Sequence, residues 1–320
     1  MITVTVSQLS EKELLFRNNL LASAGLKADT AVEETVLLWD GDTLAATGAR
    51  QNDILKCIAV NDNYQGEGLT ATVITELRKS AFKKGYRHLF LYTKPKNQMM
   101  FSALSFHPIA KTNDILLMED LKHGIRSFLD KQPRFVTSKN CGAIVMNCDP
   151  FTLGHRHLIE TASQQCDQVY VFVLSEDKGY FSADNRLKMV NEGTNDLTNV
   201  MILPTGPYLI SSATFPTYFL KENQDGNDVQ CQLDIAIFSK YYIPHFGITK
   251  RFVGEEPFCP VTQRYNQELK THLPIDVIEI PRFELNNMAV SASNVRKLLK
   301  AGNVNAASAL VPKTTASFFK

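Results

Sequence analysis

The sequence predicts an α/β protein of two domains: an α+β domain over residues 1–130, then a domain with a parallel sheet over residues 134–320. Three observations lead to this prediction. The length of 320 residues exceeds what a single hydrophobic core usually supports. A polar stretch with a proline, Lys131-Gln132-Pro133, separates the two segments. After it, β-rich runs alternate with amphipathic helical runs, which is typical of a parallel sheet covered by helices.

Composition is that of an ordinary globular protein. Hydrophobic residues make up 44% of the chain and charged residues 21%, and the formal net charge is +1. There is no basic tail, no run of roughly 18 apolar residues and no N-terminal signal-peptide pattern. The six cysteines form no C-x-x-C pair, which favours free thiols in a reducing cytoplasm. We therefore expect a cytoplasmic protein that binds neither nucleic acid nor a membrane, and its scattered histidines predict no metal site.

Periodicity predicts the elements of the first segment. Leucines at helical spacing indicate a helix near the start, and Asp40-Gly41-Asp42 predicts a hairpin between two β-rich runs. A later strand leads through a glycine-containing turn into an amphipathic helix. The expected elements are helix 9–24, strands 34–40, 43–50 and 54–60, helix 69–84, strand 88–93, and helices 97–104 and 121–130.

The second segment alternates more regularly. The expected elements are strand 141–146, helix 152–166, strand 168–174, helix 182–192, strand 199–203, helices 214–221 and 234–246, strand 251–253, helix 262–271, strand 276–280, and helices 294–300 and 304–310. Ligands bind parallel sheets at the carboxyl ends of the strands. The turn that follows strand 141–146 is therefore the first place to expect a site.

That turn reads Asn147-Cys148-Asp149-Pro150-Phe151-Thr152-Leu153-Gly154-His155. A helix beginning near Thr152 would aim free N–H groups and a partial positive charge at an anion. Gly154 would let a ligand approach closely, and His155 would add a side-chain donor in the first turn. Cys148 is better read as a small buried filler than as a nucleophile. The residues expected to bind an anionic ligand here are Asn147, Pro150, Phe151, Thr152, Gly154 and His155.

A second motif, Ser291-Ala292-Ser293-Asn294-Val295-Arg296, predicts another helix N-terminus. Ser293 is a suitable N-cap for it. Arg296, one turn in, offers a planar fork of donors that suits phosphate oxygens. Ser291, Ser293 and Arg296 are therefore expected at the same site. A capped surface helix with an exposed arginine is the alternative.

A third motif, Val253-Gly254-Glu255-Glu256-Pro257, follows a short strand. Gly254 would permit backbone contact with a nucleotide, and Glu255 and Glu256 would form either a base-reading or a structural pair. A solvent-facing loop is equally compatible. Arg186, on the helix after the second strand, either stabilises the site or lies on a solvated face.

The first segment resembles a GNAT-type N-acetyltransferase domain, on the order of its elements and on the turn Asn63-x-x-Gly66-x-Gly68. In that family such a turn donates backbone N–H groups to the pyrophosphate of acetyl-CoA. The resemblance implies contacts of a CoA moiety with Val60, Gly66 and Gly68. Asn63 and Ser105 depart from the family pattern, so the domain either transfers acetyl groups or only binds a CoA-like group.

The spacing Thr152-x-Gly154-His155, together with the Ser291–Arg296 motif, resembles the nucleotidyltransferase superfamily, which implies a Rossmann-like domain that grips ATP. Longer phrases, Met146–Arg156, Val171–Asp177 and Phe252–Phe258, resemble the citrate (pro-3S)-lyase ligase family. That resemblance implies ATP with Mg²⁺, acetate, and the thiol of the phosphoribosyl-dephospho-CoA group on the citrate lyase acyl-carrier subunit. His155 and Arg296 are then expected to be the catalytic groups.

Two other functions remain open. One is an adenylyltransferase of the pantetheine-phosphate or nicotinamide-mononucleotide type fused to an acetyltransferase. The other is a non-catalytic nucleotide-binding or scaffold subunit. Acetate-dependent release of pyrophosphate from ATP distinguishes the ligase from both.

Overall fold

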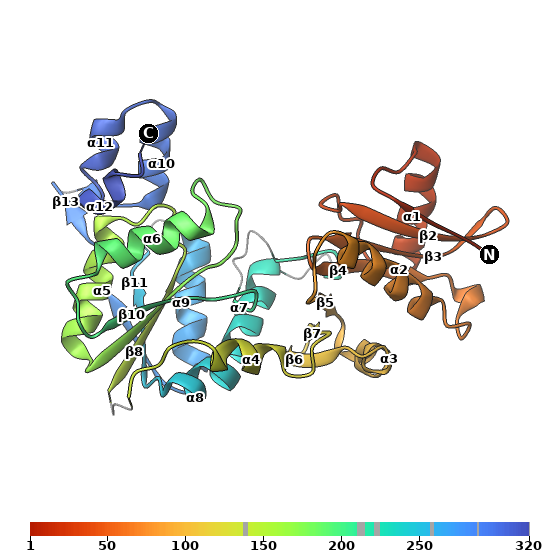
Figure 1. Ribbon diagram of the computed structural model, residues 1–320, viewed down its shortest axis with the longest axis horizontal. Helices are drawn as coiled ribbons and strands as arrows, with labels where there is room; N and C mark the ends of the chain where they lie inside the picture. Colours follow the sequence, from red (N-terminus) through yellow and green to blue (C-terminus); the bar gives the residue numbers. More distant parts are fainter. Residues whose placement is uncertain (137–139, 210–214, 221–224, 257–258, 287, 320) are drawn as a thin grey trace. The chain divides into compact units, whose positions relative to one another are not determined.

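The computed structural model describes residues 1–136, 140–209, 215–220, 225–256, 259–286 and 288–319. The chain divides into two compact units (Figure 1). One unit comprises Met1–Gly124 with Phe215–Val229, and the other comprises Ile125–Thr214 with Gln230–Lys320. Sequence reasoning had placed residues 215–229 in the second domain. None of the described helices is long and apolar enough to cross a membrane.

The N-terminal unit is a mixed sheet with helices. Its elements are β1 (Ile2–Val6), α1 (Glu11–Ser23), β2 (Glu34–Asp40), β3 (Thr43–Gln51), β4 (Ile54–Val60), η1 (Asp62–Tyr64), α2 (Leu69–Lys83), β5 (Phe90–Thr93), η2 (Pro95–Asn97), α3 (Gln98–Ala103), β6 (His107–Lys111) and β7 (Leu116–Glu119). The strand order is β1-β2-β3-β4-β5-β7-β6, and every pairing is antiparallel except β4 with β5. Strands β1, β6 and β7 were not predicted.

Helix α2 packs closely on this sheet. A Cβ at Gly48 of β3 would lie 2.4 Å from the side chain of Val73, so only glycine fits where the helix crosses the strand. The apolar side chains of α2 and of the sheet form one buried cluster. This packing fixes the turn that precedes α2.

The segment 215–220 lies against β5 of the same unit. The Tyr218 hydroxyl donates to the carbonyl of Tyr92 at 2.8 Å, and the Lys27 N–H donates to the Tyr218 carbonyl at 2.6 Å. Phe215 also makes an edge-on contact with Tyr92. These residues form a turn, so the helix predicted over 214–221 is wrong for the described residues 215–220.

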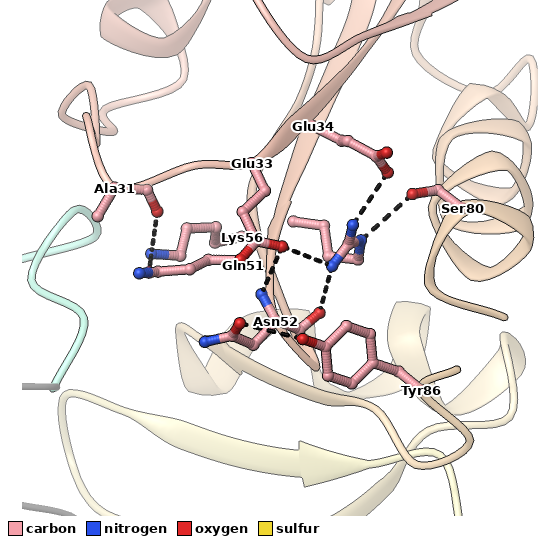
Figure 2. A network of polar contacts seen from close by, with 9 residues as sticks. Ala31, Glu33, Glu34, Gln51, Asn52, Lys56, Ser80 and Tyr86 are labelled. Atoms are coloured by element: carbon pink, nitrogen blue, oxygen red, sulfur yellow. Dashed lines mark hydrogen bonds and ion pairs between the residues drawn. The ribbon is translucent and has the colours of Figure 1, made fainter. Parts of the chain in front are cut away.

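A buried arginine organises one end of the N-terminal sheet (Figure 2). Arg50 is fully buried and pairs with Glu33 at 2.9 Å and Glu34 at 3.0 Å. Its Nε donates to Ser80 of α2 at 3.2 Å. Nearby, Lys56 donates to Gln51 at 2.7 Å. The network ties the strands to α2 because a buried guanidinium without such partners would be costly.

The C-terminal unit is built around a parallel sheet. Its elements are α4 (Gly124–Asp130), β8 (Cys141–Met146), α5 (Leu153–Gln165), β9 (Gln168–Val173), α6 (Ala183–Gly193), β10 (Val200–Pro204), α7 (Gly226–Ile237), η3 (Phe238–Tyr242), α8 (Ile243–Phe246), β11 (Lys250–Gly254), α9 (Pro260–His272), β12 (Asp276–Ile280), β13 (Glu284–Leu285), β14 (Met288–Ala289), α10 (Ala292–Lys300), α11 (Val304–Ser308) and α12 (Lys313–Ala316). The first residue of α4 and the first turn of α7, as far as Val229, belong to the N-terminal unit.

The strand order of this sheet, β10-β9-β8-β11-β12, is parallel throughout. The two-domain α/β fold class predicted from the sequence is thereby confirmed. From β8 the chain winds outward through β9 to β10, whereas β11 and β12 add on the opposite side. The loops that leave β8 and β11 therefore diverge, and such a switch point is where parallel sheets bind ligands.

The C-terminal part of the chain forms three short helices, α10, α11 and α12. Val295, Ala307 and Val311 form a small buried cluster that joins α10 to the turns after it. Figure 1 shows α12 beside α6, and the Leu153 N–H at the start of α5 donates to the Leu310 carbonyl at 3.1 Å. This arrangement brings the end of the chain to the start of α5.

Candidate active site

A buried arginine, Arg186, holds the turn after β8 in place through hydrogen bonds. Nη1 of Arg186 donates to the carbonyl of Asn147 at 2.8 Å and to its side-chain oxygen at 2.6 Å. Nη2 of the same guanidinium donates to the Glu176 carbonyl. Arg186 lies on α6 and is 0% exposed. Of the two roles left open for it, the structure supports the one in which it stabilises the turn.

Asp149 adds a second brace. Its carboxylate accepts the backbone N–H groups of Tyr180 at 2.8 Å and Phe181 at 2.9 Å, and it is 5% exposed. A Cβ at Gly179 would lie 2.9 Å from this carboxylate, so glycine is required there for the close approach. The carboxylate of Asp149 therefore helps to fix the turn.

Three residues of the turn point into the protein. Pro150 and Phe151 are buried, and Phe151 joins the core of the sheet. The Phe151 ring lies parallel to that of His155, with centroids 6.1 Å apart. Cys148 is buried, and burial raises the pKa of its thiol well above the ordinary value. The buried side chains of these residues therefore fix the shape of the turn by packing. The thiol of Cys148 is not an activated nucleophile.

Thr152 and His155 cap the start of α5 reciprocally. The Thr152 hydroxyl accepts the His155 N–H at 3.3 Å, and Nδ1 of His155 lies 3.0 Å from the Thr152 N–H. Because Nδ1 accepts that hydrogen bond, the proton of the neutral imidazole is on Nε2. The capping box therefore fixes both the orientation of the ring and the nitrogen that can donate to a ligand.

His155 is kept neutral by its surroundings. Desolvation by the surrounding protein, followed by the positive charges of Arg282 and Arg296, lowers its pKa from 6.5 to about 4. At neutral pH the ring is consequently a neutral Nε2–H donor. The positive charges that act on the pKa of the ring are those of Arg282 and Arg296.

Gly154 serves a different purpose from the one expected. A Cβ there would lie 3.4 Å from the Val290 carbonyl and 4.0 Å from Cβ of Phe283. Glycine thus lets the chain between β12 and α10 pack over the first turn of α5. Among the described residues the Gly154 N–H has no hydrogen-bond partner, so it remains a donor for a ligand.

The N-cap of α10 is Ser291, and the prediction of Ser293 was wrong. The Ser291 side chain accepts the Asn294 N–H at 3.2 Å, and α10 begins at Ala292. Ser293 is exposed in the first turn, with its hydroxyl 3.5 Å from that of Ser291. The helix starts two residues earlier than predicted because either serine satisfies the capping preference locally.

Arg296 joins α10 to the turn after β8. Its Nη1 donates to the Asp149 carbonyl and lies 3.7 Å from the Asp149 carboxylate. Two segments separated by more than a hundred residues are thus brought together by this one side chain. Arg296 therefore contacts the turn that leads into the helix bearing His155.

The end of β11 and the loop after it contain Gly254, Glu255 and Glu256, three further residues of the candidate site. Gly254 has open space where a Cβ would be, and its carbonyl accepts from Asn266 of α9 at 2.9 Å. Glu255 accepts the backbone N–H of Arg282 at 3.4 Å, and Glu256 forms an ion pair with the Arg282 guanidinium. The two glutamates are therefore a structural pair for Arg282, while Pro257 and Phe258 lie outside the described residues.

Sequence reasoning missed Arg282. It follows β12 in Ile280-Pro281-Arg282 and carries no motif of its own. The one available signal was its place after the last strand of the sheet, at the edge where ligands bind.

The glycine turn of the N-terminal unit is more open. Gly66 (φ +91°) and Gly68 (φ +74°) are left-handed, and a Cβ at either would meet nothing within 4 Å. Gly68 is the N-cap of α2, and the half-buried Val60 ends β4 just before the turn. The turn therefore has open space at both glycines, directly before the first N–H groups of α2, and a helix N-terminus favours an anion.

Within the described residues, no group of three His, Cys, Asp or Glu side chains could hold a metal ion. The C-terminal cluster instead combines a neutral imidazole N–H, two guanidinium groups and free helix N–H groups. Such a set can hold a polyphosphate and stabilise charge that shifts within it, without any protein nucleophile.

Comparison with known proteins shows the family of this chain. Residues 141–319 match the family described as citrate lyase ligase C-terminal domain. A citrate (pro-3S)-lyase ligase from Klebsiella pneumoniae is 43% identical over 92% of this chain and 88% of its own. The chain belongs to the citrate lyase ligase family. It is an enzyme, a ligase.

Further relatives carry the same name. The citrate (pro-3S)-lyase ligase of Escherichia coli K12 is 35% identical over 100% of this chain and 94% of its own. That of Haemophilus influenzae is 36% identical over 97% and 96%. Among solved structures, Escherichia coli ElaA aligns with 38% of this chain and 99% of its own, at 14% identity and a TM-score of 0.34.

Proposed function

We propose that this chain activates citrate lyase by acetylating the thiol of the prosthetic group on its acyl-carrier subunit. Acetate attacks the α-phosphorus of ATP, forming acetyl-adenylate and releasing pyrophosphate. The carrier thiol then takes the acetyl group, and AMP leaves. The names of the full-length relatives support the target, and the cluster around His155 supports ATP as the energy source.

The first step needs positioning and charge stabilisation rather than a base. Acetate is ionised at neutral pH, because carboxyl groups titrate near ~4. The obstacle is its approach to the negative triphosphate. His155 Nε2–H, Arg296 and the free N–H of Gly154 would share the charge that accumulates on the leaving pyrophosphate. Mg²⁺ would enter with the phosphates of ATP.

The adenosine end would lie at the switch point, beside the open edge of Gly254. In this proposal Glu255 helps to bind ATP from the loop after β11. The hydroxyls of Ser291 and Ser293 help to bind it from the start of α10. The turn at Asn147, Pro150, Phe151 and Thr152 contributes shape and backbone groups.

The N-terminal unit would hold the carrier's prosthetic arm. That arm is a dephospho-CoA derivative, so it carries a pyrophosphate. The uncovered glycine turn at Gly66 and Gly68, followed by the first N–H groups of α2, suits such a group. Val60, at the end of β4, would contact the arm beside it.

One observation carries the proposal: Arg296 reaches from α10 to the Asp149 carbonyl, within the turn that also bears His155. The test is reactivation of citrate lyase in its thiol form by the purified chain, with ATP and acetate. We expect reactivation and stoichiometric pyrophosphate only when both are present. Pyrophosphate release that requires phosphopantetheine or nicotinamide mononucleotide, and not acetate, would overturn the proposal in favour of an adenylyltransferase.

A further inference from the structure

Strands β4 and β5 of the N-terminal unit separate toward their carboxyl ends. Both strands are fully described, and they pair in parallel at two positions, the last of which is Leu55 with Leu91. Beyond this pair β4 is bulged: Cys57 has φ +54°, and the register of β4 with β3 shifts between Lys56 and Ala59. Because a bulge bends its strand, β4 turns away from β5 and the ladder of hydrogen bonds ends there.

The side chain of Tyr218 takes the place of the next ladder hydrogen bond. The Phe90 N–H donates to the carbonyl of Asp53, directly before β4, at 2.9 Å, so the carbonyl of Tyr92, two residues on, faces β4 as well. In the parallel register its donor would be the Cys57 N–H. The Tyr218 hydroxyl donates to this carbonyl instead, at 2.8 Å. Tyr218 therefore closes the gap between β4 and β5.

The segment around Tyr218 is firmly held within the N-terminal unit. Three further large apolar side chains of this segment are buried with it: Phe215, Phe219 and Leu220. The Lys27 N–H donates to the Tyr218 carbonyl at 2.6 Å. Burial raises the pKa of the Tyr218 hydroxyl well above its ordinary value, so the hydroxyl remains a donor at neutral pH. Withdrawing Tyr218 would bring its apolar neighbours into water as well, which disfavours a mobile lid.

The closed gap lies at the edge of the sheet where the glycine turn begins. Strands β4 and β5 are parallel, so their carboxyl ends share one edge. Strand β4 ends at Val60, before the turn that contains Gly66, and Tyr92 is the next-to-last residue of β5. A ligand bound through its pyrophosphate at this turn would therefore meet Tyr218 rather than free backbone groups of the two strands.

We propose that Tyr218 determines how much of the prosthetic arm the N-terminal unit binds: the pyrophosphate end lies at the glycine turn, and the closed gap keeps the thiol end outside the sheet. This inference rests on the proposed function and deepens it. The acetyl group is activated by the C-terminal cluster, so the thiol must stay free to reach it. The N-terminal unit then binds the arm without transferring an acetyl group itself.

Ligand binding to the wild-type chain tests this inference. Calorimetry compares dephospho-CoA with its S-bimane derivative, which carries a bulky group on the sulfur. A saturating non-hydrolysable MgATP analogue occupies the nucleotide site of the C-terminal cluster throughout. We expect the derivative to bind no more than about threefold more weakly, because a sulfur outside the sheet has room for the group. A derivative that binds roughly 10- to 100-fold more weakly, the effect of overpacking a closed site, would overturn the inference.

Tyr218→Ala removes the side chain that closes the gap. The thiol end can then enter, so we expect the derivative to bind at least about tenfold more weakly than dephospho-CoA. Acetylation of the carrier should slow, whereas acetate-dependent pyrophosphate exchange should not change. Equal affinities in this folded variant would also overturn the inference. The wild-type comparison needs no variant, so it decides the question where Tyr218→Ala does not fold.

Phe219→Ala is the matched control. It removes a neighbouring buried ring, which contacts that of Tyr218 edge-on at 5.2 Å, but it leaves the hydroxyl bonded to Tyr92. We expect this variant to bind the two ligands alike, as the wild-type chain does. Discrimination in both variants would assign the effect to loosened packing of the segment and would overturn the role of Tyr218.

Gly66→Ala identifies the site that is titrated. Both ligands should bind more weakly in this variant, and to the same extent, because both carry the pyrophosphate. A wild-type chain that binds neither ligand, or binding that Gly66→Ala leaves unchanged, would overturn the proposed role of the glycine turn and this inference with it. A selective loss of the bulky derivative in the wild-type chain would overturn this inference alone.

Discussion

The glycine turn of the N-terminal unit and the histidine turn of the C-terminal unit both follow a strand and open a helix. They are held in different ways. Side chains from distant elements brace the histidine turn: Arg186 binds Asn147, and Arg296 reaches Asp149. The glycine turn is shaped mainly by near neighbours, such as the Asn61 side chain, which accepts the Asn63 N–H at 3.1 Å. The histidine turn is thus fixed by long-range contacts, whereas the glycine turn is fixed mainly by local ones.

The largest effect should come from His155. His155→Ala removes the Nε2–H donor and is expected to lower the rate of acetate-dependent pyrophosphate release by roughly 10²–10³-fold. The chain should stay folded, since losing the cap costs on the order of 1 kcal/mol. Glutamine reaches the position of Nε2 and asparagine that of Nδ1. His155→Gln should therefore retain more activity than His155→Asn, and the opposite order would contradict the assigned tautomer.

The next largest effect should come from removing the hydrogen bonds that Arg186 donates to the turn after β8. Arg186→Met leaves the Asn147 oxygens without their donor, and we expect a loss of roughly 3 kcal/mol in the free energy of unfolding, measured by urea titration. Because Asn147 and the turn then move, kcat and MgATP affinity should fall together. A variant with unchanged MgATP affinity would show that the turn does not depend on this arginine.

The N-terminal turn should respond separately. Gly66→Ala meets no steric contact but places a side chain at φ +91°, a strained conformation. We expect the KM for the acyl carrier to rise roughly tenfold, equivalent to ~1.4 kcal/mol. Formation of acetyl-adenylate should not change. A defect in pyrophosphate release without carrier would instead place this turn in the first step.

Point variants suit this test better than deletion of the N-terminal domain. Residues 215–229 group with that unit, and the Tyr218 hydroxyl bonds to Tyr92 of β5. Deleting residues 1–130 would expose the aromatic side chains of this segment, so a loss of activity would not identify its cause.

The smallest effect should be in the pH dependence. With a His155 pKa of about 4, kcat/KM for ATP should show no acid limb at 6.5 and should fall only near pH 4. The lowered pKa of His155 also makes the free energy of unfolding larger at neutral pH than at acid pH. The unfolded chain binds the proton below about 6.5 and the folded one only below about 4. The contribution is complete above pH 6.5 and is lost as pH falls toward 4. An acid limb at 6.5 that disappears in His155→Gln would contradict the assignment.

Much of the fold could be predicted because local sequence patterns determine it. The alternation of strands and helices gave the parallel sheet, and the Thr152 cap gave the start of α5. Strands β1, β6 and β7 were missed because each is only four or five residues long, and β6 contains a proline. The position of 215–220 depends on long-range hydrogen bonds, which periodicity does not report.

The site shows the same division. Thr152, His155 and Arg296 could be identified because their roles follow from helix termini and known motifs. Arg282 and the partners of the Asp149 carboxylate could not be identified, because the contacts involved join residues far apart in the chain. The cap at Ser291 was misassigned to Ser293 because the local capping preference does not distinguish two serines in one turn.

Acetate-dependent exchange of labelled pyrophosphate into ATP, measured without the carrier, tests the central claim most directly. It reports formation of acetyl-adenylate by the C-terminal cluster alone. We expect exchange with the wild-type chain that requires acetate, persists in Gly66→Ala and is lost in His155→Ala and in Arg296→Ala. Exchange that persists in both folded variants, or that needs no acetate, would contradict the account.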